Sequence, residues 1–428
     1  MIKPDLLIAP VVAALVLGAS LVVLPKCVAG EGDPPPESMT RIAAEKAVLD
    51  TVAPVEEIRG LTFKHEVSVT VVSDDTARRH ATDRLRKFYS DGEIHAQQEA
   101  YVALGLLPEG TDVLKEYLEV LEEQAGGFYD PGTKSFFLLD DMPAAAAPML
   151  AAHELTHALE DQYFDLDARL EQALPDEDRA FAVGAVHEGS AMLVMSLYVA
   201  RGLTEGSLTQ EGLEAMGESE ASRGERLVAM PPALQRAFLG AYVLGMSFLT
   251  RGDLASLADG FPVEDADIAS RAGPQSSEQI LHPEKFWDAE LRDPPTAIAP
   301  FDLKKVLGRK WKRTAFGNLG ELLIGVMVGA PTPPGLAAMA TPSGSDWTNA
   351  AAEGWDGDRW EIWRRGESSV VVLSTVWDSA RDAEEFAGAL DPDAGLRFEV
   401  RGERVAVVAG EADVDAQQLL DAVFDSGS

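Results

Sequence analysis

The sequence predicts an α+β protein with a mostly helical first part, residues 39–330, and a small α+β domain at residues 345–428. Three observations support this fold class. The chain has 428 residues and 46% of them are hydrophobic, which is enough for the cores of two or three domains. Between residues 39 and 330 most apolar residues recur with helical spacing, interrupted by one alternating stretch and one hairpin pattern. After a Pro-rich break, the pattern strand, strand, helix occurs twice.

The net charge limits the partners of the protein. Lys plus Arg number 36 and Asp plus Glu number 71, which gives a formal net charge of −35. Such a surface repels nucleic acids and anionic membranes, so we predict no nucleic-acid partner and no membrane contact outside the N-terminal segment. An acidic surface is typical of solubility outside the cytoplasm or in a salty medium, and attraction of cationic substrates is the alternative.

Residues 1–29 have the pattern of a signal peptide or an uncleaved membrane anchor. Residues 6–24 contain no charge, and lysines lie on both sides of them, at positions 3 and 26. The protein is therefore expected to be exported and to be periplasmic, extracellular or anchored to the cell envelope by this segment.

Cys27 is the only cysteine, so the chain cannot form an intramolecular disulfide. It follows the apolar run, where a bacterial lipoprotein carries its lipid, but Lys26 replaces the small residue that the lipoprotein signal prefers. Residues 30–38 include three consecutive prolines and are expected to form an extended linker.

The first folded elements combine helices with a few strands. The spacing predicts helices at 43–52, 76–88 and 111–124 and a strand at 65–72. Residues 126–139 then have the pattern of a hairpin with its turn at Asp130-Pro131-Gly132. Its first strand is expected to be an edge strand, to which an extended peptide can add by backbone hydrogen bonds; a purely structural hairpin is the alternative.

The most informative stretch is His153-Glu154-Leu155-Thr156-His157, in a segment expected to be helical from residue 147. Positions i and i+4 of a helix share one face, so His153 and His157 can offer ring nitrogens to the same metal ion. Glu154 lies next to the first histidine, where its carboxylate can take a proton from a water at the metal. The pattern therefore predicts two of the three protein ligands of a catalytic zinc site.

A third ligand has to come from another segment. Tyr163, six positions beyond the second histidine, argues against the class of zinc enzymes whose third histidine follows on the same run. Glu188 lies on the next apolar helix, expected at 180–200, after an acidic and turn-rich stretch at 161–178. Neighbouring His187 points about 100° away around that helix, so only one of the two faces the metal. We predict that Glu188 is the ligand, with His187 as the alternative.

These residues resemble the gluzincin clan of zinc metallopeptidases, in which His-Glu-x-x-His is followed by a glutamate on a second helix. Three longer motifs resemble a group of largely uncharacterised exported bacterial proteins of this type. They are Leu-x-x-Gln-x-x-Gly-Phe-Tyr-Asp-Pro at 121–131, His-Glu-Leu-Thr-His-Ala-Leu-x-Asp-Gln at 153–162 and Leu-His-Pro-Glu-Lys at 281–285. The resemblance covers residues 56–286 and implies a zincin-like metallopeptidase domain with a small edge-strand sheet.

The same resemblance implies the roles of the site residues. One zinc ion per chain would be bound by His153, His157 and Glu188, and Glu154 would act as base and proton shuttle. The sequence departs from the pattern at Ser190, where the resemblance leads us to expect an aspartate. If this position orients a histidine ligand, the serine weakens metal binding.

Peptide hydrolysis also needs a hydrogen-bond donor for the oxygen that becomes negative. Tyr242 lies on an apolar helix that could pack against the site; the alternative is a core tyrosine with a satisfied hydroxyl. His282 follows a polar loop and could turn toward the substrate; the alternative is a histidine that fixes the loop. Both residues are candidate catalytic donors.

The C-terminal domain carries no comparable constellation. We expect strands at 360–364, 369–376, 396–400 and 404–408 and helices at 380–390 and 414–424. These elements fit a small sheet with helices on one face. Trp355 and Trp360 are expected in its core rather than on a binding surface. Docking, inhibition of the site and substrate presentation are all compatible with such a domain.

Together these observations predict an exported zinc-dependent metallopeptidase, a hydrolase that acts on a peptide or protein substrate. The alternative from another class is a non-catalytic envelope protein, binding or chaperone-like, that keeps the fold without turnover. A purely structural zinc site would need a fourth ligand, and the sequence offers no convincing one.

Overall fold

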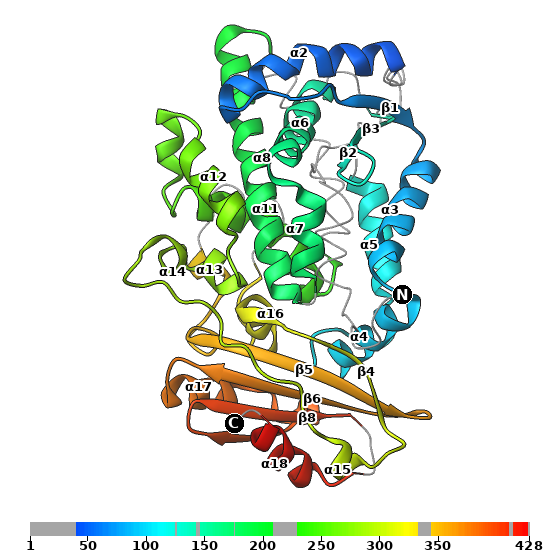
Figure 1. The fold of residues 1–428 in the computed structure, drawn as a ribbon, viewed down its shortest axis with the longest axis vertical. Coiled ribbons are helices and arrows are strands. Elements are labelled where there is room, and N and C mark those ends of the chain that lie inside the picture. Colours follow the sequence, from blue (N-terminus) through cyan, green and yellow to red (C-terminus); the bar gives the residue numbers. More distant parts are fainter. Residues whose placement is uncertain are drawn as a thin grey trace.

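The computed structural model shows a helical part that packs on a five-stranded sheet (Figure 1). The α+β class predicted from the sequence is confirmed. The predicted leader, the linker and Cys27 lie outside the residues that the structure describes. The described residues are 40–124, 126–142, 146–174, 176–208, 229–332, 344–410 and 414–426.

The helical part fills the upper half of the view in Figure 1. Its longer helices are α2 (Arg41–Arg59), α3 (Asp74–Phe88), α4 (Asp91–Ala103), α5 (Val113–Gln124), α6 (Ala147–Phe164), α8 (Glu177–Glu205) and α11 (Pro232–Leu249). Its shorter helices are α7 (Leu166–Ala173), η1 (Leu254–Asp259), α12 (Val263–Ala272), α13 (Ser277–Leu281) and α14 (Glu284–Trp287).

Two helices differ from the sequence prediction. Helix α2 is longer than expected, because Thr40 caps its first turn and the chain stays helical until Gly60, whose φ of 73° ends it. Helix α7 lies within the stretch that we expected to be turn-rich, so that expectation is wrong. Leu170 and Ala173 of α7 are buried, and this tertiary packing stabilises a short helix that the acidic local sequence does not suggest.

A three-stranded sheet lies beside the first helices, in the order β1 (Ser68–Val72), β3 (Ser135–Leu139), β2 (Gly127–Asp130). Strand β2 pairs antiparallel with β3, which confirms the hairpin, and it forms one edge of the sheet. The N–H of Leu139 donates to the carbonyl of Gly126, so in this register Gly127 and Tyr129 direct their backbone groups away from β3. Strand β2 therefore presents backbone groups toward α6, the helix that carries the histidine motif.

The second sheet has the order β4-β5-β6-β8-β7, with antiparallel neighbours throughout. Its strands are β4 (Lys312–Gly317), β5 (Trp355–Arg365), β6 (Ser368–Trp377), β7 (Arg397–Arg401) and β8 (Arg404–Ala409). The helices in this half are α15 (Lys304–Leu307), α16 (Gly320–Met327), η3 (Gly344–Trp347), α17 (Ala380–Ala389), η4 (Pro392–Ala394) and α18 (Ala416–Ser426). All six predicted elements of the C-terminal domain are present.

Helices cover both faces of this sheet, so the prediction of helices on one face is wrong. Trp360, Ile362, Val371 and Leu373 pack toward α17 and the helical part. Trp363, Val370 and Val372 pack toward α18. Strand β6 is apolar at consecutive positions 370–373, and β5 is buried at consecutive positions 357–363, as in a sheet that is covered on both sides. Trp355 and Trp360 are buried, as expected for core residues.

The two halves share one continuous core. Strand β4 joins the sheet from residues upstream of 345, where we expected the domain to begin. The ring of Tyr101 on α4 meets Trp360 on β5 edge-on, with 5.9 Å between the ring centroids. Buried apolar side chains of α8, α11 and α16 continue this contact into the helical part.

Among the described residues, only helix α8 is long and apolar enough to cross a membrane. Most of its apolar stretch is buried inside the protein. This burial is typical of a core helix.

Asp358 on β5 lies buried at the junction of the two halves. Its carboxylate accepts the backbone N–H groups of Leu319 and Gly320, at 2.8 to 3.0 Å, where α16 begins. Burial raises the pKa of Asp358 to about 7. In the unfolded chain an aspartate ionises near pH ~4. The free energy of unfolding should therefore fall as the pH rises from about 4 to about 7, because the unfolded state releases its proton first.

Asp358→Asn removes the charge and keeps an oxygen that can accept both N–H groups. We expect the variant to exceed the natural chain in free energy of unfolding by up to about 4 kcal/mol above pH 7, and by much less at pH 4. Urea unfolding at pH 4 and pH 8 measures this difference, with the exposed Asp346→Asn as control. The same effect at both pH values would contradict the assignment.

Candidate metal centre

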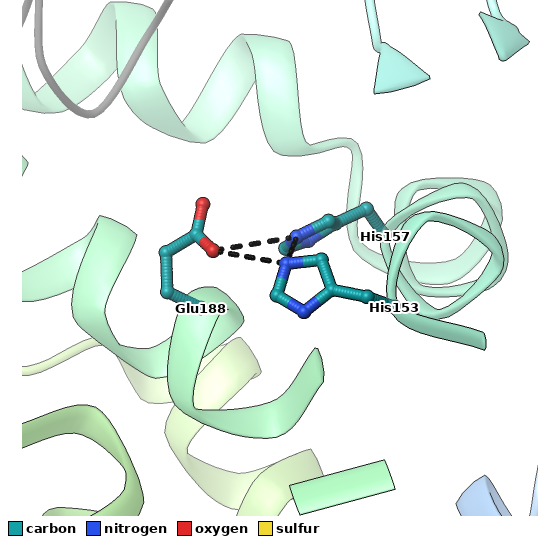
Figure 2. A group of neighbouring side chains, drawn as sticks. All are labelled: His153, His157 and Glu188. Carbon is teal, nitrogen blue, oxygen red and sulfur yellow. Dashed lines mark hydrogen bonds and ion pairs between the residues drawn. The ribbon is translucent and has the colours of Figure 1, made fainter. Parts of the chain in front are cut away.

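Two helices carry the predicted metal ligands. His153 and His157 lie one turn apart on α6, and both side chains are buried. Glu188 comes from α8, which packs beside α6. Figure 2 shows the three side chains converging from the two helices. The structure thus brings Glu188 to His153, which lies 35 positions earlier in the sequence.

The spacing of the three ligand atoms suits one ion. The Nε2 atoms of His153 and His157 are 3.0 Å apart, and Oε2 of Glu188 lies 3.2 Å from the first and 3.5 Å from the second. Tetrahedral zinc, with bonds of about 2.0 to 2.1 Å, places neighbouring ligand atoms about 3.3 Å apart. Within the described part of the chain no fourth His, Cys, Asp or Glu belongs to this group. Three protein ligands of these types fit a catalytic zinc site.

Glu154 is held by the edge strand. Its side chain is fully buried, and its Oε2 accepts the backbone N–H of Tyr129 on β2 at 2.7 Å. Its Oε1 is also buried and has no hydrogen-bond partner among the described residues. A buried carboxylate oxygen without a partner is costly, so it indicates a group that has to interact with something in the site. A water next to a bound ion would satisfy it.

Burial is the largest influence on the pKa values of Glu154 and His153. It raises the pKa of Glu154 well above its usual range, and the neighbouring Glu188 carboxylate raises it further. Burial also lowers the pKa of His153 to about 4, although Glu188 opposes this change. The neutral imidazole is the form that binds metals. A cation between the ligands would counteract the rise at Glu154, because it favours the ionised carboxylate.

A second polar cluster joins α2, α6 and α8. Glu160, one turn after His157, accepts from Nε of Arg59 at 2.6 Å, from Oγ of Ser190 at 2.5 Å and from Nδ1 of His187 at 2.8 Å. Burial alone would raise the pKa of Glu160, but Arg59 and His187 outweigh it and lower the pKa to about 2. The cluster therefore contains a buried, ionised carboxylate next to the face of α6 that carries the candidate metal ligands.

The position of Ser190 differs from the role that the resemblance suggested. Its hydroxyl donates to Glu160 and orients neither histidine ligand. Nδ1 of His153 is buried without a hydrogen-bond partner among the described residues. A metal-binding histidine usually donates this N–H to a carboxylate or a carbonyl, so His153 lacks a contact that would strengthen its binding of a metal ion.

Tyr242 lies beside the metal ligands. Helix α11 crosses α8 where Gly245 meets Gly189, and a Cβ on either glycine would overlap the backbone of the facing helix. This close approach brings the ring of Tyr242 to 6.2 Å from the ring of His153, measured between centroids. Tyr242 is buried there, and its role as a donor stays a prediction.

His282 lies elsewhere. Its Nε2 is 3.0 and 3.1 Å from the two carboxylate oxygens of Glu321 on α16. Burial would lower the pKa of His282, but the Glu321 carboxylate outweighs this effect and raises the pKa to about 8. The structure therefore does not bring His282 to the metal ligands, and its partner favours the alternative of a histidine that fixes the local structure.

A pocket of about 60 Å³ adjoins the ligands, which leaves room for a few water molecules. It is lined by Arg84, Tyr129, Pro131, His157, Leu166, Leu170, Val183, Gly184, His187 and Glu188. None of these residues belongs to the C-terminal sheet. The pocket geometry thus gives no support to direct occlusion of the site by the C-terminal domain.

Sequence reasoning assigned no role to Tyr129, Glu160 or Arg59, and it considered His187 only as the alternative to Glu188 as the third metal ligand. Glu160 carried a usable signal, because it lies seven residues after His153 and therefore on the same face of the helix. Arg59 is 101 positions from Glu160 and meets it only through the packing of α2 on α6, for which the local sequence contains no signal.

Comparison with known proteins finds one match, and it covers only part of the C-terminal half. Residues 309–394 match the model of a domain of unknown function, DUF8575. This match runs from just before β4 through α17, in agreement with the sheet beginning upstream of residue 345. The chain matches no curated protein and no solved structure.

Proposed function

We propose that this protein is an exported zinc-dependent metallopeptidase that hydrolyses peptide bonds in a peptide or protein substrate. The observation that supports this most directly is the convergence of His153, His157 and Glu188 next to Glu154, whose Oε1 has no partner among the described residues. A zinc ion in this site would polarise the substrate carbonyl. It would also lower the pKa of a water, so that the water loses a proton more easily and can attack the carbonyl.

The residues of the chain supply the remaining steps. Glu154 takes a proton from the attacking water and passes it to the leaving amine, so the broken C–N bond ends as a carboxylic acid and an amine. The N–H of Tyr129 holds Oε2 of Glu154 and leaves Oε1 for the water. The phenol of Tyr242 is the candidate donor to the substrate oxygen that becomes negative.

Strand β2 is the edge to which an extended peptide would add, although its residues are buried and its outward backbone groups face α6 in this structure. It is an edge strand, and the outward N–H of Tyr129 already contacts Glu154. A substrate strand that paired with the outward carbonyls of Gly127 and Tyr129 would lie next to the catalytic carboxylate. The small pocket is well below the roughly 300 to 1,000 Å³ of ligand sites, so we infer that its walls separate when a peptide binds.

Export is proposed from residues 6–24, whose uncharged run between lysines fits a signal peptide or an anchor. The net charge of −35 supports a substrate other than nucleic acid.

The test begins with the metal content of the purified chain. We expect one zinc per chain, hydrolysis of fluorescein-labelled casein, and loss of both in Glu188→Ala. A chelator should abolish hydrolysis, and added zinc should restore it. Glu205→Ala, at the exposed end of the same helix, is the matched control and should keep its zinc.

Two results would change the conclusion. If the natural chain binds no zinc, the motif is not a metal site, and the non-catalytic binding protein becomes the better description. If zinc is bound but no casein or peptide is cleaved, the protein keeps the fold and the metal but is not an active peptidase.

A further inference from the structure

His187 is the residue of the pocket wall that the proposed mechanism does not use. It precedes the ligand Glu188 on α8, is 7% exposed, and lines the same pocket as His157 and Glu188. It does not belong to the group of three ligand atoms, so it is not a further metal ligand. A histidine in this position can touch whatever lies next to the ion.

The orientation of the His187 ring is fixed by Glu160, which does not line the pocket. Nδ1 lies 2.8 Å from Oε2 of Glu160. Because Glu160 is an ionised carboxylate and can only accept, Nδ1 carries the hydrogen of this bond. Nε2 is therefore the polar ring atom that remains for a group in the pocket.

Glu160 is itself held in place. Arg59 donates to its Oε1 at 2.6 Å and also donates to Asp267 on α12 at 3.0 Å. Ser190 donates to the same Oε1 of Glu160. A ring that only filled space would not need a carboxylate held by side chains from two other helices, α2 and α8, whereas a substrate contact does need a fixed ring.

We propose that His187 contacts the substrate through Nε2 and that Glu160, held by Arg59 and Ser190, is the positioning residue for its ring. The inference rests on the proposed function, because the substrate lies in the pocket only if the zinc site is catalytic. It also replaces His282, whose ring is bound to Glu321, as the histidine that contacts the substrate.

Two substitutions separate the two ring nitrogens. Asn at position 187 places its amide where Nδ1 lies, so His187→Asn keeps the contact with Glu160 and offers nothing at Nε2. Gln reaches the position of Nε2, so His187→Gln keeps a polar group in the pocket and loses the contact with Glu160. His187→Ala removes both.

The variants are compared with the natural, zinc-loaded chain in three measurements. These are zinc content, kcat and KM for fluorescein-labelled casein, and the affinity for a phosphinic alanyl dipeptide, which imitates the tetrahedral state of the substrate. We expect about one zinc in every variant. We expect kcat/KM and phosphinate affinity to fall at least about tenfold in His187→Asn and His187→Ala, and to fall less in His187→Gln, which keeps a polar group at the position of Nε2 but loses the Glu160 contact that fixes it.

The opposite pattern would overturn the inference. If His187→Asn behaves like the natural chain while His187→Gln loses activity, the histidine only supports Glu160. If all variants match the natural chain, His187 does not touch the substrate, although the metallopeptidase proposal stands. If the natural chain holds zinc but neither cleaves casein nor binds the phosphinate, the metallopeptidase proposal itself fails, and the role of His187 fails with it.

Discussion

Glu154→Gln is expected to lower kcat for peptide hydrolysis by about 10³-fold while the zinc content stays near one per chain. Gln has almost the same shape as Glu, and its amide oxygen can still accept the N–H of Tyr129. It cannot take a proton from the attacking water. The loss should therefore appear in kcat rather than in metal binding, since His153, His157 and Glu188 are unchanged.

The same variant should fold at least as well as the natural chain. Glu154 is fully buried, and burial raises its pKa well above the usual range, so its charge opposes folding. Thermal unfolding of the metal-free protein measures this, and Glu171→Gln on the exposed side of α7 is a control for the loss of one negative charge. Unchanged turnover in Glu154→Gln would remove Glu154 from the mechanism.

The convergence of the three candidate ligands could be predicted from the sequence because their signals are local. His153 and His157 share one helical turn, and the spacing alone places them on one face. Glu188 needed a further step, the packing of a second apolar helix on the first. The edge hairpin could also be predicted, because an Asp-Pro-Gly turn between short apolar strands leaves few other structures.

The surroundings of the ligands could not be predicted in the same way. The cluster of Arg59, Glu160 and His187 joins three helices, and its members acquire their roles only when those helices pack. The surroundings of His282 could not be predicted either. Its polar loop suggested a mobile donor, but its partner Glu321 belongs to a helix 39 positions away, which the local sequence does not reveal.

The close packing of α8 on α11 makes the protein sensitive to a larger residue at their crossing. Gly245→Ala should destabilise the protein by about 2 to 4 kcal/mol and reduce zinc binding and activity as well. A Cβ at this position would overlap the carbonyl oxygen of Ala185 on α8, so the two helices would have to separate. Glu188 lies next to the crossing on α8 and Tyr242 lies one turn away on α11, so the separation would displace a metal ligand and the candidate donor.

Gly240→Ala on the same helix is the matched control. A Cβ there would lie 3.4 Å from Cζ of Phe181, an ordinary contact, so the substitution should be neutral or stabilise α11 by up to about 1 kcal/mol. Denaturant unfolding and zinc content of the two variants give the comparison. If Gly245→Ala is as stable as Gly240→Ala but has lost its zinc, the crossing serves the site alone. If both variants keep full stability and zinc, the close approach of the two helices does not hold the metal centre together, and the position of Tyr242 beside His153 has to depend on other contacts.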